Sequence, residues 1–398
     1  MEPRTRPDHL PRRQLIVLGS GVTALAVVRA AYHLGVSSVV VDNLSGIATA
    51  SRLAHADVHS ALRTKELVPR IRELAQRAPS SLLATSDVWL RAIIARRAEL
   101  SVSGMDILHP DNARLEICLD KSRFAAWREQ NWLPAPRPYP VTADLNPEPE
   151  RSVAFPVLVR PAETEHSRRV ATAPHAVEVR CVQDLAQCLD GYRRAGAVPI
   201  VGESLLGRRL QQFSVGAAVS APTMVTVVTR KLRPPPDACA VGSLVEATEQ
   251  PDVERLAQRA LLALDYHGIA EVEILRDEDS GEVFLIEVNA RPWLQFAIAG
   301  ARGADLLAFV LERRSSARSS PTEHTRQRAV WLDFRYDLRV CFGPRGLVRT
   351  GRLGLWAYLR SIVRANVFAR WSLSDPLPAW TDFCTLLRGA LSRAVRLR

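Results

Sequence analysis

An apolar run at residues 283–286 leads into three polar side chains whose spacing suits a metal and an anion. Glu287, Asn289 and Arg291 follow the run at alternate positions. Four apolar residues in succession are typical of a buried strand, since a solvated strand alternates. Side chains along a strand point alternately to its two faces, so these three point to the same face. A carboxylate and an amide oxygen are ligands that Mg²⁺ takes beside phosphate oxygens, and an arginine binds phosphate or carboxylate.

A second acidic strand precedes this one. The stretch 271–275, which contains Glu273, is separated from the apolar run by the polar, glycine-containing residues 276–281, and this pattern indicates a hairpin. Pairing of the two strands brings Glu273 beside Glu287, and two carboxylates that close need a cation between them. An ordinary hairpin with scattered charge is the alternative, but Glu, Asn and Arg seldom fall at strand-end spacing by accident.

The hairpin resembles the metal-binding hairpin of the ATP-grasp ligases, in which one strand carries a Glu and the next carries Glu-x-Asn-x-Arg. The resemblance is to carboxylate–amine ligases related to the D-aspartate ligases and to the ATP-grasp domain of the carbamoyl-phosphate synthase large subunit. It implies that Glu273, Glu287 and Asn289 bind Mg²⁺, or Mn²⁺ in its place, and that Arg291 holds the acylphosphate or the substrate carboxylate. The implied reaction activates a small-molecule carboxylate as an acylphosphate at the expense of ATP, joins it to an amine and releases ADP.

Two further motifs follow the family's order. Asp120-Lys121, with the Leu-Pro-Ala-Pro of residues 133–136 after it, resembles the entry to the ATP-grasp domain, where the lysine reaches the nucleotide phosphates. Residues 155–161 resemble the strand that carries a second phosphate-binding lysine, although this chain has Arg160 in that place. An arginine keeps the positive charge and binds phosphate through two parallel hydrogen bonds.

The stretch 199–207 resembles the hinge strand of the family, whose Glu and following backbone groups receive the adenine ring. The resemblance implies that Glu203, Ser204 and Leu205 bind this part of ATP. The motifs together cover about residues 14–310, and the hairpin is the most specific of them.

Lysine is rare in this chain, so each lysine is informative. Of 53 Lys and Arg residues, only Lys65, Lys121 and Lys231 are lysines. A lysine in such a chain suggests a need for a compact ammonium group rather than a planar guanidinium. Lys231 and Arg233 lie in a basic stretch that resembles a strand placed near the phosphates and the acceptor in several of these ligases, so we expect catalytic roles for both. Lys65 fits a solvated helix face.

One segment departs from the family pattern. Residues 162–169 stand where many members have a glycine-rich lid whose amides cover the phosphates, yet this stretch contains no glycine. Arg168 and Arg169 either replace those amides or are solvated. A lid-deficient ATP-grasp protein that binds nucleotide without ligating anything is therefore an alternative function.

The N-terminal residues support a rival interpretation. Gly19-Ser20-Gly21 begins a G-x-G-x-x-A pattern after a short apolar strand, and Asp42 ends the next strand about twenty residues on. These features are typical of a Rossmann enzyme that binds NAD or FAD, with pyrophosphate at the helix N-terminus and the Asp on a ribose hydroxyl. The same βαβ opens many ATP-grasp proteins without binding a dinucleotide.

Composition points to a reduced, cytoplasmic protein. The six cysteines form no CxxC pair and no zinc-binding spacing, so we expect reduced thiols. No run of 18 or more apolar residues exists, and the N-terminus lacks the apolar stretch that secretion requires. We expect small-molecule carboxylate and amine substrates and a homodimer.

The net charge of +11 is concentrated in one segment. Residues 311–398 contain 17 Arg and six Asp or Glu, whereas the rest of the chain is neutral. A basic surface usually meets an anionic partner, such as nucleic acid, lipid head groups, an anionic carrier or an acidic polymer, and the alternative is a solvated helical face. We expect the tryptophans of this segment to be core anchors, namely Trp331, Trp356, Trp371 and Trp380.

The expected fold class is α/β and α+β: an N-terminal, Rossmann-like βαβ (pre-ATP-grasp) domain, then an ATP-grasp domain of two α+β subdomains and a basic C-terminal extension. The residue pattern at 329–338 predicts a strand, and the pattern at 356–363 predicts an amphipathic helix. The expected ranges are a flexible N-terminus at 1–13, the βαβ domain at 14–113, the ATP-grasp domain at 114–310, a polar linker at 311–328 and the extension at 329–398.

Overall fold

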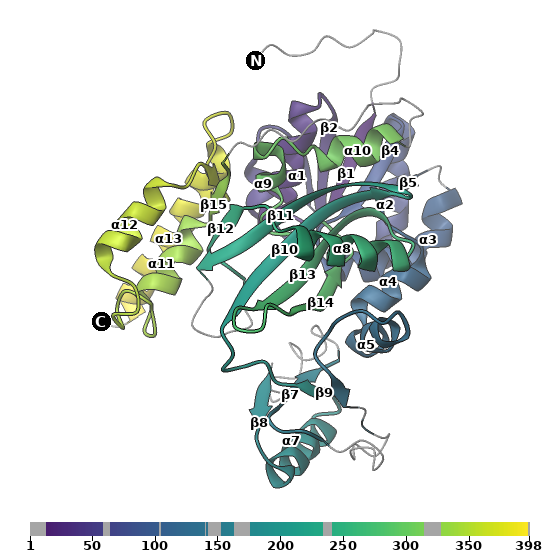
Figure 1. Ribbon diagram of the computed structural model, residues 1–398. Coiled ribbons are helices and arrows are strands. Elements are labelled where there is room, and N and C mark those ends of the chain that lie inside the picture. Colours follow the sequence, from purple (N-terminus) through teal and green to yellow (C-terminus); the bar gives the residue numbers. More distant parts are fainter. Residues whose placement is uncertain are drawn as a thin grey trace. The chain divides into compact units, whose positions relative to one another are not determined.

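The structure is a computed structural model, shown in Figure 1, that describes part of the chain. The described residues are 13–58, 64–102, 105–139, 141, 153–162, 176–233, 241–313 and 328–396. Residues 1–12, Arg168 and Arg169 of the expected lid, and most of the expected linker lie outside them.

The chain forms two compact units, each built from separate stretches of sequence. Unit 1 comprises Met1–His109, Arg291–Arg335 and Leu359–Arg398, and unit 2 comprises Pro110–Ala290 and Tyr336–Tyr358. The domain boundaries that we expected from the sequence describe continuous ranges, and they stay a prediction.

Unit 1 contains a five-stranded parallel sheet in the order β3-β2-β1-β4-β5. Its central strand has four fully buried apolar residues, as expected of a parallel sheet with helices on its faces. The strands are β1 (Gln14–Leu18), β2 (Ser37–Asp42), β3 (His55–Val58), β4 (Ser80–Ala84) and β5 (Asp106–Ile107). The helices of the unit are α1 (Val22–His33), the 3₁₀ helix η1 (Ile47–Ala50), α2 (Thr64–Arg77), α3 (Asp87–Val102), α9 (Ala297–Ala301), α10 (Leu306–Arg313) and α13 (Leu377–Arg396). The expected βαβ opening is confirmed.

The glycine loop after β1 is occupied by contacts within unit 1. Gly19 has φ +111°, a conformation that favours glycine, and a Cβ there would lie 2.4 Å from Thr85 Oγ1. Ser20 donates its hydroxyl to the carbonyl of Leu44 at 3.0 Å, and its carbonyl accepts from the amide of Ala48 at 2.9 Å. The loop thus serves packing, which does not favour the dinucleotide interpretation.

A buried aspartate fixes the C-terminal part of unit 1. Asp375 is fully buried; its carboxylate accepts from Arg29 Nε at 3.3 Å, from Ser51 Oγ at 2.9 Å and from the amide of Arg52 at 3.3 Å. Since an unpaired buried carboxylate would be costly, these contacts join the residues before α13 to α1 and η1. The segment is an integral part of the unit.

The strand predicted at residues 329–338 is shorter than expected. β15 (Val330–Leu332) pairs in parallel with β16 (Val367–Phe368), but helix α11 (Phe334–Phe342) begins two residues after β15 ends. The strand prediction was wrong beyond Leu332 because the buried positions of α11, Asp337, Val340 and Cys341, follow helical spacing. The helix predicted at 356–363 is confirmed as α12 (Leu355–Val363).

Unit 2 contains two antiparallel sheet regions. The larger one has the strand order β14-β13-β10-β11-β12, with β14 at the edge and α8 (Pro251–Ala263) packed against it. Its strands are β10 (Leu210–Ser220), β11 (Thr223–Arg233), β12 (Leu244–Ala247), β13 (His267–Asp277) and β14 (Val283–Asn289). Helices α4 (Asn112–Leu119) and α5 (Lys121–Gln130) precede both regions in sequence. None of the described helices is both long and apolar enough to cross a bilayer.

The smaller sheet of unit 2 has the order β6-β9-β7-β8 and is covered by α7 (Val182–Arg194). Its strands are β6 (Pro138–Tyr139), β7 (Val157–Pro161), β8 (Val177–Val179) and β9 (Pro199–Glu203). Leu185, Leu189 and Tyr192 of α7 pack onto Val157 and Val159 of β7 in one apolar cluster. The opposite face of β7 remains available for the site. The mixed α/β and α+β fold class is confirmed.

The glycine loop generates a first prediction. Gly19→Ala should lower the free energy of unfolding by about 2–4 kcal/mol, because a Cβ at this φ is strained and meets the Thr85 hydroxyl. Gly21→Ala is the matched control: Gly21 has φ −77°, and a Cβ there would have no other atom within 4 Å, so we expect a loss below about 1 kcal/mol. Urea unfolding followed by circular dichroism measures both, and equal stability of the two variants would contradict the packing role.

Candidate functional site

The site is built on the hairpin of β13 and β14. The two strands pair with Glu273 opposite Glu287, which confirms the pairing predicted from the sequence. Lys231 of β11 places Nζ 3.7 Å from Glu273 Oε2, and its side chain is 10% exposed. A cation therefore stands beside the carboxylate pair, as the repulsion between two carboxylates requires.

A β-bulge sets the direction of Glu287. Glu273 pairs with Glu287 but Ile274 pairs with Leu285, so Ile286 is an extra residue on β14. In a regular strand, residues 286 and 287 would face opposite sides. Across the bulge, Ile286 and Glu287 line the same pocket. Nothing in the local sequence indicated this extra residue.

Helix α5 binds the outer edge of β14. Arg128 donates through Nη1 to the carbonyl of Leu285 at 2.6 Å and, at 3.4 Å, to that of Ile286. The amide of Leu285 donates to the carbonyl of Pro134 at 2.7 Å. These bonds satisfy backbone groups that an edge strand leaves without a partner strand. They also hold α5 against the bulge.

Arg128 is a site residue that the sequence reasoning missed. It is 8% exposed, its guanidinium lies 5.2 Å from the centre of the Phe124 ring, and Nε has no hydrogen-bond partner among the described residues. Burial first, and repulsion from Arg160 second, lower the pKa of Arg128 to about 10, while Glu287 opposes the shift. Its spacing of seven residues from Lys121, two helical turns, was the available signal.

Lys121 is held at the start of α5. Asp120 caps the helix: its carboxylate accepts from the amides of Ser122 at 2.8 Å and Arg123 at 3.1 Å. The amide of Lys121 also donates to the carbonyl of Ala162, just after β7, at 3.4 Å. The main chain of Lys121 is thus attached to the end of β7, the strand that carries Arg160.

Arg160 lies on the pocket face of β7. Burial alternates along this strand, with Val157, Val159 and Pro161 buried and Arg160 partly exposed. Its partner across the antiparallel pairing is Ile200 of β9, which lines the pocket too. Strand periodicity therefore directs Arg160 away from the core formed with α7.

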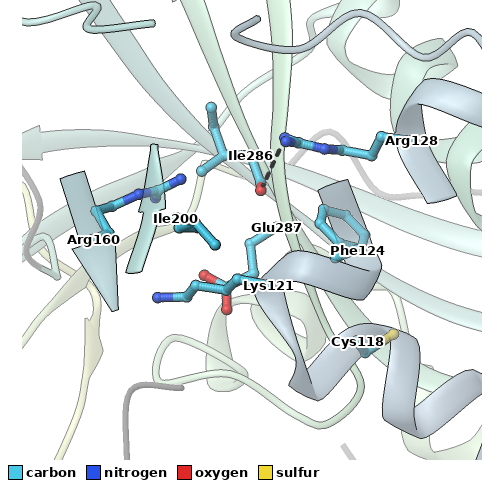
Figure 2. A pocket seen from close by; sticks show the side chains of 8 residues that line it. All are labelled: Cys118, Lys121, Phe124, Arg128, Arg160, Ile200, Ile286 and Glu287. Carbon is cyan, nitrogen blue, oxygen red and sulfur yellow. Dashed lines mark hydrogen bonds between the residues drawn. The ribbon is translucent and has the colours of Figure 1, made fainter. Parts of the chain in front are cut away.

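These residues converge on one pocket within unit 2, shown in Figure 2. The pocket is lined by Cys118, Lys121, Phe124, Arg128, Arg160, Ile200, Ile286 and Glu287. Three cations therefore face one carboxylate. Among the described residues, no acidic group forms an ion pair with Lys121 or Arg160. This excess of positive charge suits an anion with several negative charges.

Asn289 and Glu271 form a second cross-strand pair beside the carboxylates. The two residues are opposite each other, and Asn289 Nδ2 donates to Glu271 Oε2 at 3.0 Å. Glu271 is 5% exposed and was not singled out from the sequence, although it lies two residues before Glu273 and hence on the same strand face. The bond uses the amide nitrogen of Asn289, so the amide oxygen is the atom suited to a metal.

The donor set fits a metal that keeps other ligands. Among the described residues, no group of three or more His, Cys, Asp or Glu side chains is placed to hold a metal ion. Glu273, Glu287 and Asn289 instead offer two carboxylates and one amide. Mg²⁺ is usually bound through one or two carboxylates together with waters and substrate phosphates, so this set fits Mg²⁺ beside a phosphate better than a metal held by protein alone.

The expected adenine-binding residues are the last residue of β9, Glu203, and the two that follow it, Ser204 and Leu205. Glu203 accepts from the amide of Arg137 at 3.2 Å and from the Arg208 guanidinium. Ser204 is buried and donates its hydroxyl to Glu178 Oε2 at 2.7 Å, a bond that lowers the pKa of Glu178 with the help of Arg180. Leu205 is also buried. None of the three lines the pocket of Figure 2.

Both arginines that were expected to be catalytic form ion pairs with aspartates. Arg233 is 4% exposed and donates through Nη1 to both carboxylate oxygens of Asp337 at 2.5 Å, in contact with the Tyr358 ring. Ser243 donates to the same Asp337 at 2.6 Å. Arg291 belongs to unit 1, where its Nε donates to Asp87 Oδ1 at 2.6 Å. The placement of Arg233 favours a structural role.

Comparison with known proteins identifies the fold. No protein-family model matches the chain, and no curated protein matches it either. Among solved structures, N5-carboxyaminoimidazole synthetase from Staphylococcus aureus matches with a TM-score of 0.63 at 11% identity, over 83% of this chain and 84% of that chain. The L-amino acid ligase from Bacillus licheniformis matches with a TM-score of 0.57 at 15% identity, over 78% and 76%.

A third similar structure was solved with nucleotide. It is the biotin carboxylase domain dimer of the Hydrogenobacter thermophilus 2-oxoglutarate carboxylase, in complex with MgADP, ADP and bicarbonate. It matches with a TM-score of 0.62 at 14% identity, over 81% of this chain and 74% of that chain. The chain thus has the fold of the ATP-grasp ligases, which confirms the expected fold. The comparisons give no support to an anionic carrier or polymer at the C-terminal segment.

The buried ion pair of unit 2 generates a second prediction. Asp337→Ala should lower the free energy of unfolding by about 3–5 kcal/mol, because it leaves Arg233 buried without its carboxylate. Asp190→Ala, which removes the exposed partner of Arg193 and Arg194 on α7, is the control and should cost less than about 1 kcal/mol. Urea unfolding measures both variants.

A double variant separates structure from catalysis at this position. Arg233→Met with Asp337→Leu replaces the pair by apolar groups and should recover most of the lost stability. If Arg233 is structural, the recovered protein keeps its nucleotide affinity and turnover. A stable double variant without turnover would instead assign Arg233 to catalysis.

Proposed function

We propose that this protein is an ATP-dependent, ADP-forming ligase that activates a carboxylate as an acylphosphate and joins it to an amine. One observation carries the proposal: in a chain with the ATP-grasp fold, Lys121, Arg160 and Glu287 line one pocket, and Glu287 faces Glu273 across the hairpin. Cations for phosphates and carboxylates for a metal are thereby adjacent. The loop on which the rival dinucleotide function rests is instead occupied by the contacts of Gly19 and Ser20 within unit 1.

Lys121 and Arg160 would bind the ATP phosphates. Both side chains are partly exposed and line the pocket. Glu287 alone does not balance their positive charge, whereas a polyphosphate would. Glu203, Ser204 and Leu205 would receive the adenine at the end of β9, through backbone groups, since the Ser204 and Leu205 side chains are buried. Arg128 would act indirectly, by holding the strand that carries Glu287.

Glu273, Glu287 and Asn289 would hold Mg²⁺, or Mn²⁺ in its place. MgATP would supply the phosphoryl group to a carboxylate oxygen of the substrate with release of ADP, and the amine would then displace phosphate from the acylphosphate. The protein's part is to position the reactants and to neutralise charge, which needs little covalent chemistry from side chains. Lys231, held beside Glu273, and Arg291 would bind the transferred phosphate or the substrate carboxylate.

The carboxylate pair generates a third prediction. Glu287→Ala and Glu273→Ala should each reduce ADP release from MgATP by about a hundredfold or more, because Mg²⁺ held by these carboxylates would lose a ligand. Glu282→Ala, an exposed position in the turn of the same hairpin, should keep the wild-type rate. The assay uses MgATP with pools of amino acids as acceptors. Wild-type rates in both variants would exclude the hairpin as the metal site.

Arg160 generates a fourth prediction. Arg160→Ala should weaken ATP binding by about tenfold to a hundredfold, the range for a lost hydrogen bond to a charged group. Arg160→Lys should retain most of the affinity, because the charge remains. Arg193→Ala, an exposed arginine of α7, is the control. Calorimetry measures the dissociation constants.

Unchanged ATP binding by Arg160→Ala would mean that β7 has no role in nucleotide binding. ATP binding by the wild-type protein without ADP release would favour the alternative function, a nucleotide-binding protein without ligase activity.

A further inference from the structure

Exposed apolar side chains gather in one segment of the chain. Fourteen of the 23 large apolar residues that are exposed among the described residues fall between 334 and 387. Three of the four tryptophans expected in the core are among them: Trp356 is 81% exposed, Trp380 63% and Trp371 50%. Only Trp331 is buried, so the core-anchor expectation was wrong for the other three. Solvated apolar surface on this scale usually marks an interaction site.

Helix α12 (yellow-green in Figure 1) presents an apolar face to solvent. Leu355, Trp356, Leu359 and Val363 are 54%, 81%, 43% and 85% exposed. At about 100° per residue, these four positions fall within about 100° of one another around the helix axis. Tyr358 is the one buried residue of α12. The helix is therefore anchored through Tyr358 while its apolar face has no partner among the described residues.

Helix α13 has a stripe of the same kind in unit 1. Leu377, Trp380, Phe383 and Leu387 are all exposed and recur at helical spacing. The Trp380 and Phe383 ring centroids are 5.9 Å apart, so the two aromatic side chains form one surface. Two helices thus carry apolar stripes that the described part of the chain leaves uncovered.

The exposed charged groups of residues 334–387 are almost all positive. Six arginines of residues 339–364 are exposed and have no acidic partner among the described residues; they are Arg339, Arg345, Arg349, Arg352, Arg360 and Arg364. The four acidic residues between 328 and 387 do not offset them. Asp333, Asp337 and Asp375 are buried, and Asp382 is paired with Arg335 and Arg370. The exposed surface of the segment is therefore cationic as well as apolar.

We propose that the apolar stripes of α12 and α13 each bind the surface of an anionic phospholipid membrane. Their Trp, Leu, Phe and Val side chains enter the boundary between head groups and acyl chains, and the exposed arginines of residues 339–364 bind the lipid phosphates. A second copy of the chain would bring like charges together across a two-fold axis, which is unfavourable. A nucleic acid would satisfy the arginines but would leave Leu355, Leu359 and Val363 in water.

The test is vesicle flotation of the full-length protein at low salt, without nucleotide. Vesicles of phosphatidylglycerol and phosphatidylcholine in equal parts should bind the protein, and vesicles of phosphatidylcholine alone should bind it much less. Raising the salt should weaken the binding, since the attraction is screened over about 10 Å at 0.1 M. Because no ATP is present, the result is independent of ligase activity.

Substitutions at exposed positions identify the surface. Trp356→Ser with Val363→Ser should weaken vesicle binding by about tenfold or more through the lost apolar contact. Arg360→Glu with Arg364→Glu should weaken binding to the anionic vesicles by about tenfold or more, through the reversed charge. Trp132→Ser removes an equally exposed indole (86%) outside the segment and should leave binding unchanged. All variants change exposed side chains, and circular dichroism checks that they fold.

Four results would overturn the proposal. The first is failure of the wild-type protein to bind anionic vesicles at low salt, and the second is equal binding by Trp356→Ser/Val363→Ser. The third is a dimer, measured by light scattering, that dissociates in this variant although vesicles are not bound. The fourth is binding of a single-stranded oligonucleotide that depends on Trp356 and displaces the protein from vesicles.

Discussion

The two hydrogen bonds that capture Leu285 at the edge of β14 are the contact on which the candidate site depends. The carbonyl accepts from Arg128 and the amide donates to the Pro134 carbonyl, so the exposed edge of the sheet is covered by α5 and the residues after it. One consequence is geometric: Lys121 begins the helix whose Arg128 is attached two residues from Glu287. An arginine suits this place better than a lysine, because its planar guanidinium lies against the Phe124 ring while Nη1 donates to the Leu285 carbonyl.

The same contact has an electrostatic cost. Arg128 is buried near Arg160, and both burial and this repulsion disfavour its charged form. Glu287 is the one carboxylate that lines the pocket with these cations among the described residues. The folded protein thus retains an excess of positive charge in this pocket, and a bound anion would offset that charge. Uncompensated charges, which lower the stability of the folded protein, are expected at binding sites, because a ligand of opposite charge offsets them. The cation excess supports the phosphate-binding role independently of the fold comparison.

The parts of the structure that could be predicted from the sequence are those set by local pattern. Apolar runs and turn residues located the βαβ opening and the hairpin, and period-two alternation put Glu273 opposite Glu287. The bulge at Ile286 could not be predicted, because it depends on how β14 meets α5 rather than on its own residues. Arg128 was missed for the same reason: its partners are more than 150 positions away. Residues 334–338 resembled a strand, but the buried positions of α11, Asp337, Val340 and Cys341, follow helical spacing, and Asp337 is buried with Arg233.

The net charge of the C-terminal segment, counted from its sequence, did not describe the charge of its surface. Two of its aspartates are buried and bind partners in the interior. Asp375 binds Arg29 and Ser51 in unit 1, and Asp337 binds Arg233 and Ser243 in unit 2. The arginines of residues 339–364 stay at the surface, so the surface is more basic than the composition of the segment. Because the aspartates hold buried partners, deletion of the segment would leave Arg233 as an unpaired charge in the interior. Loss of binding after such a deletion would therefore report unfolding, whereas substitutions at exposed positions change the surface alone.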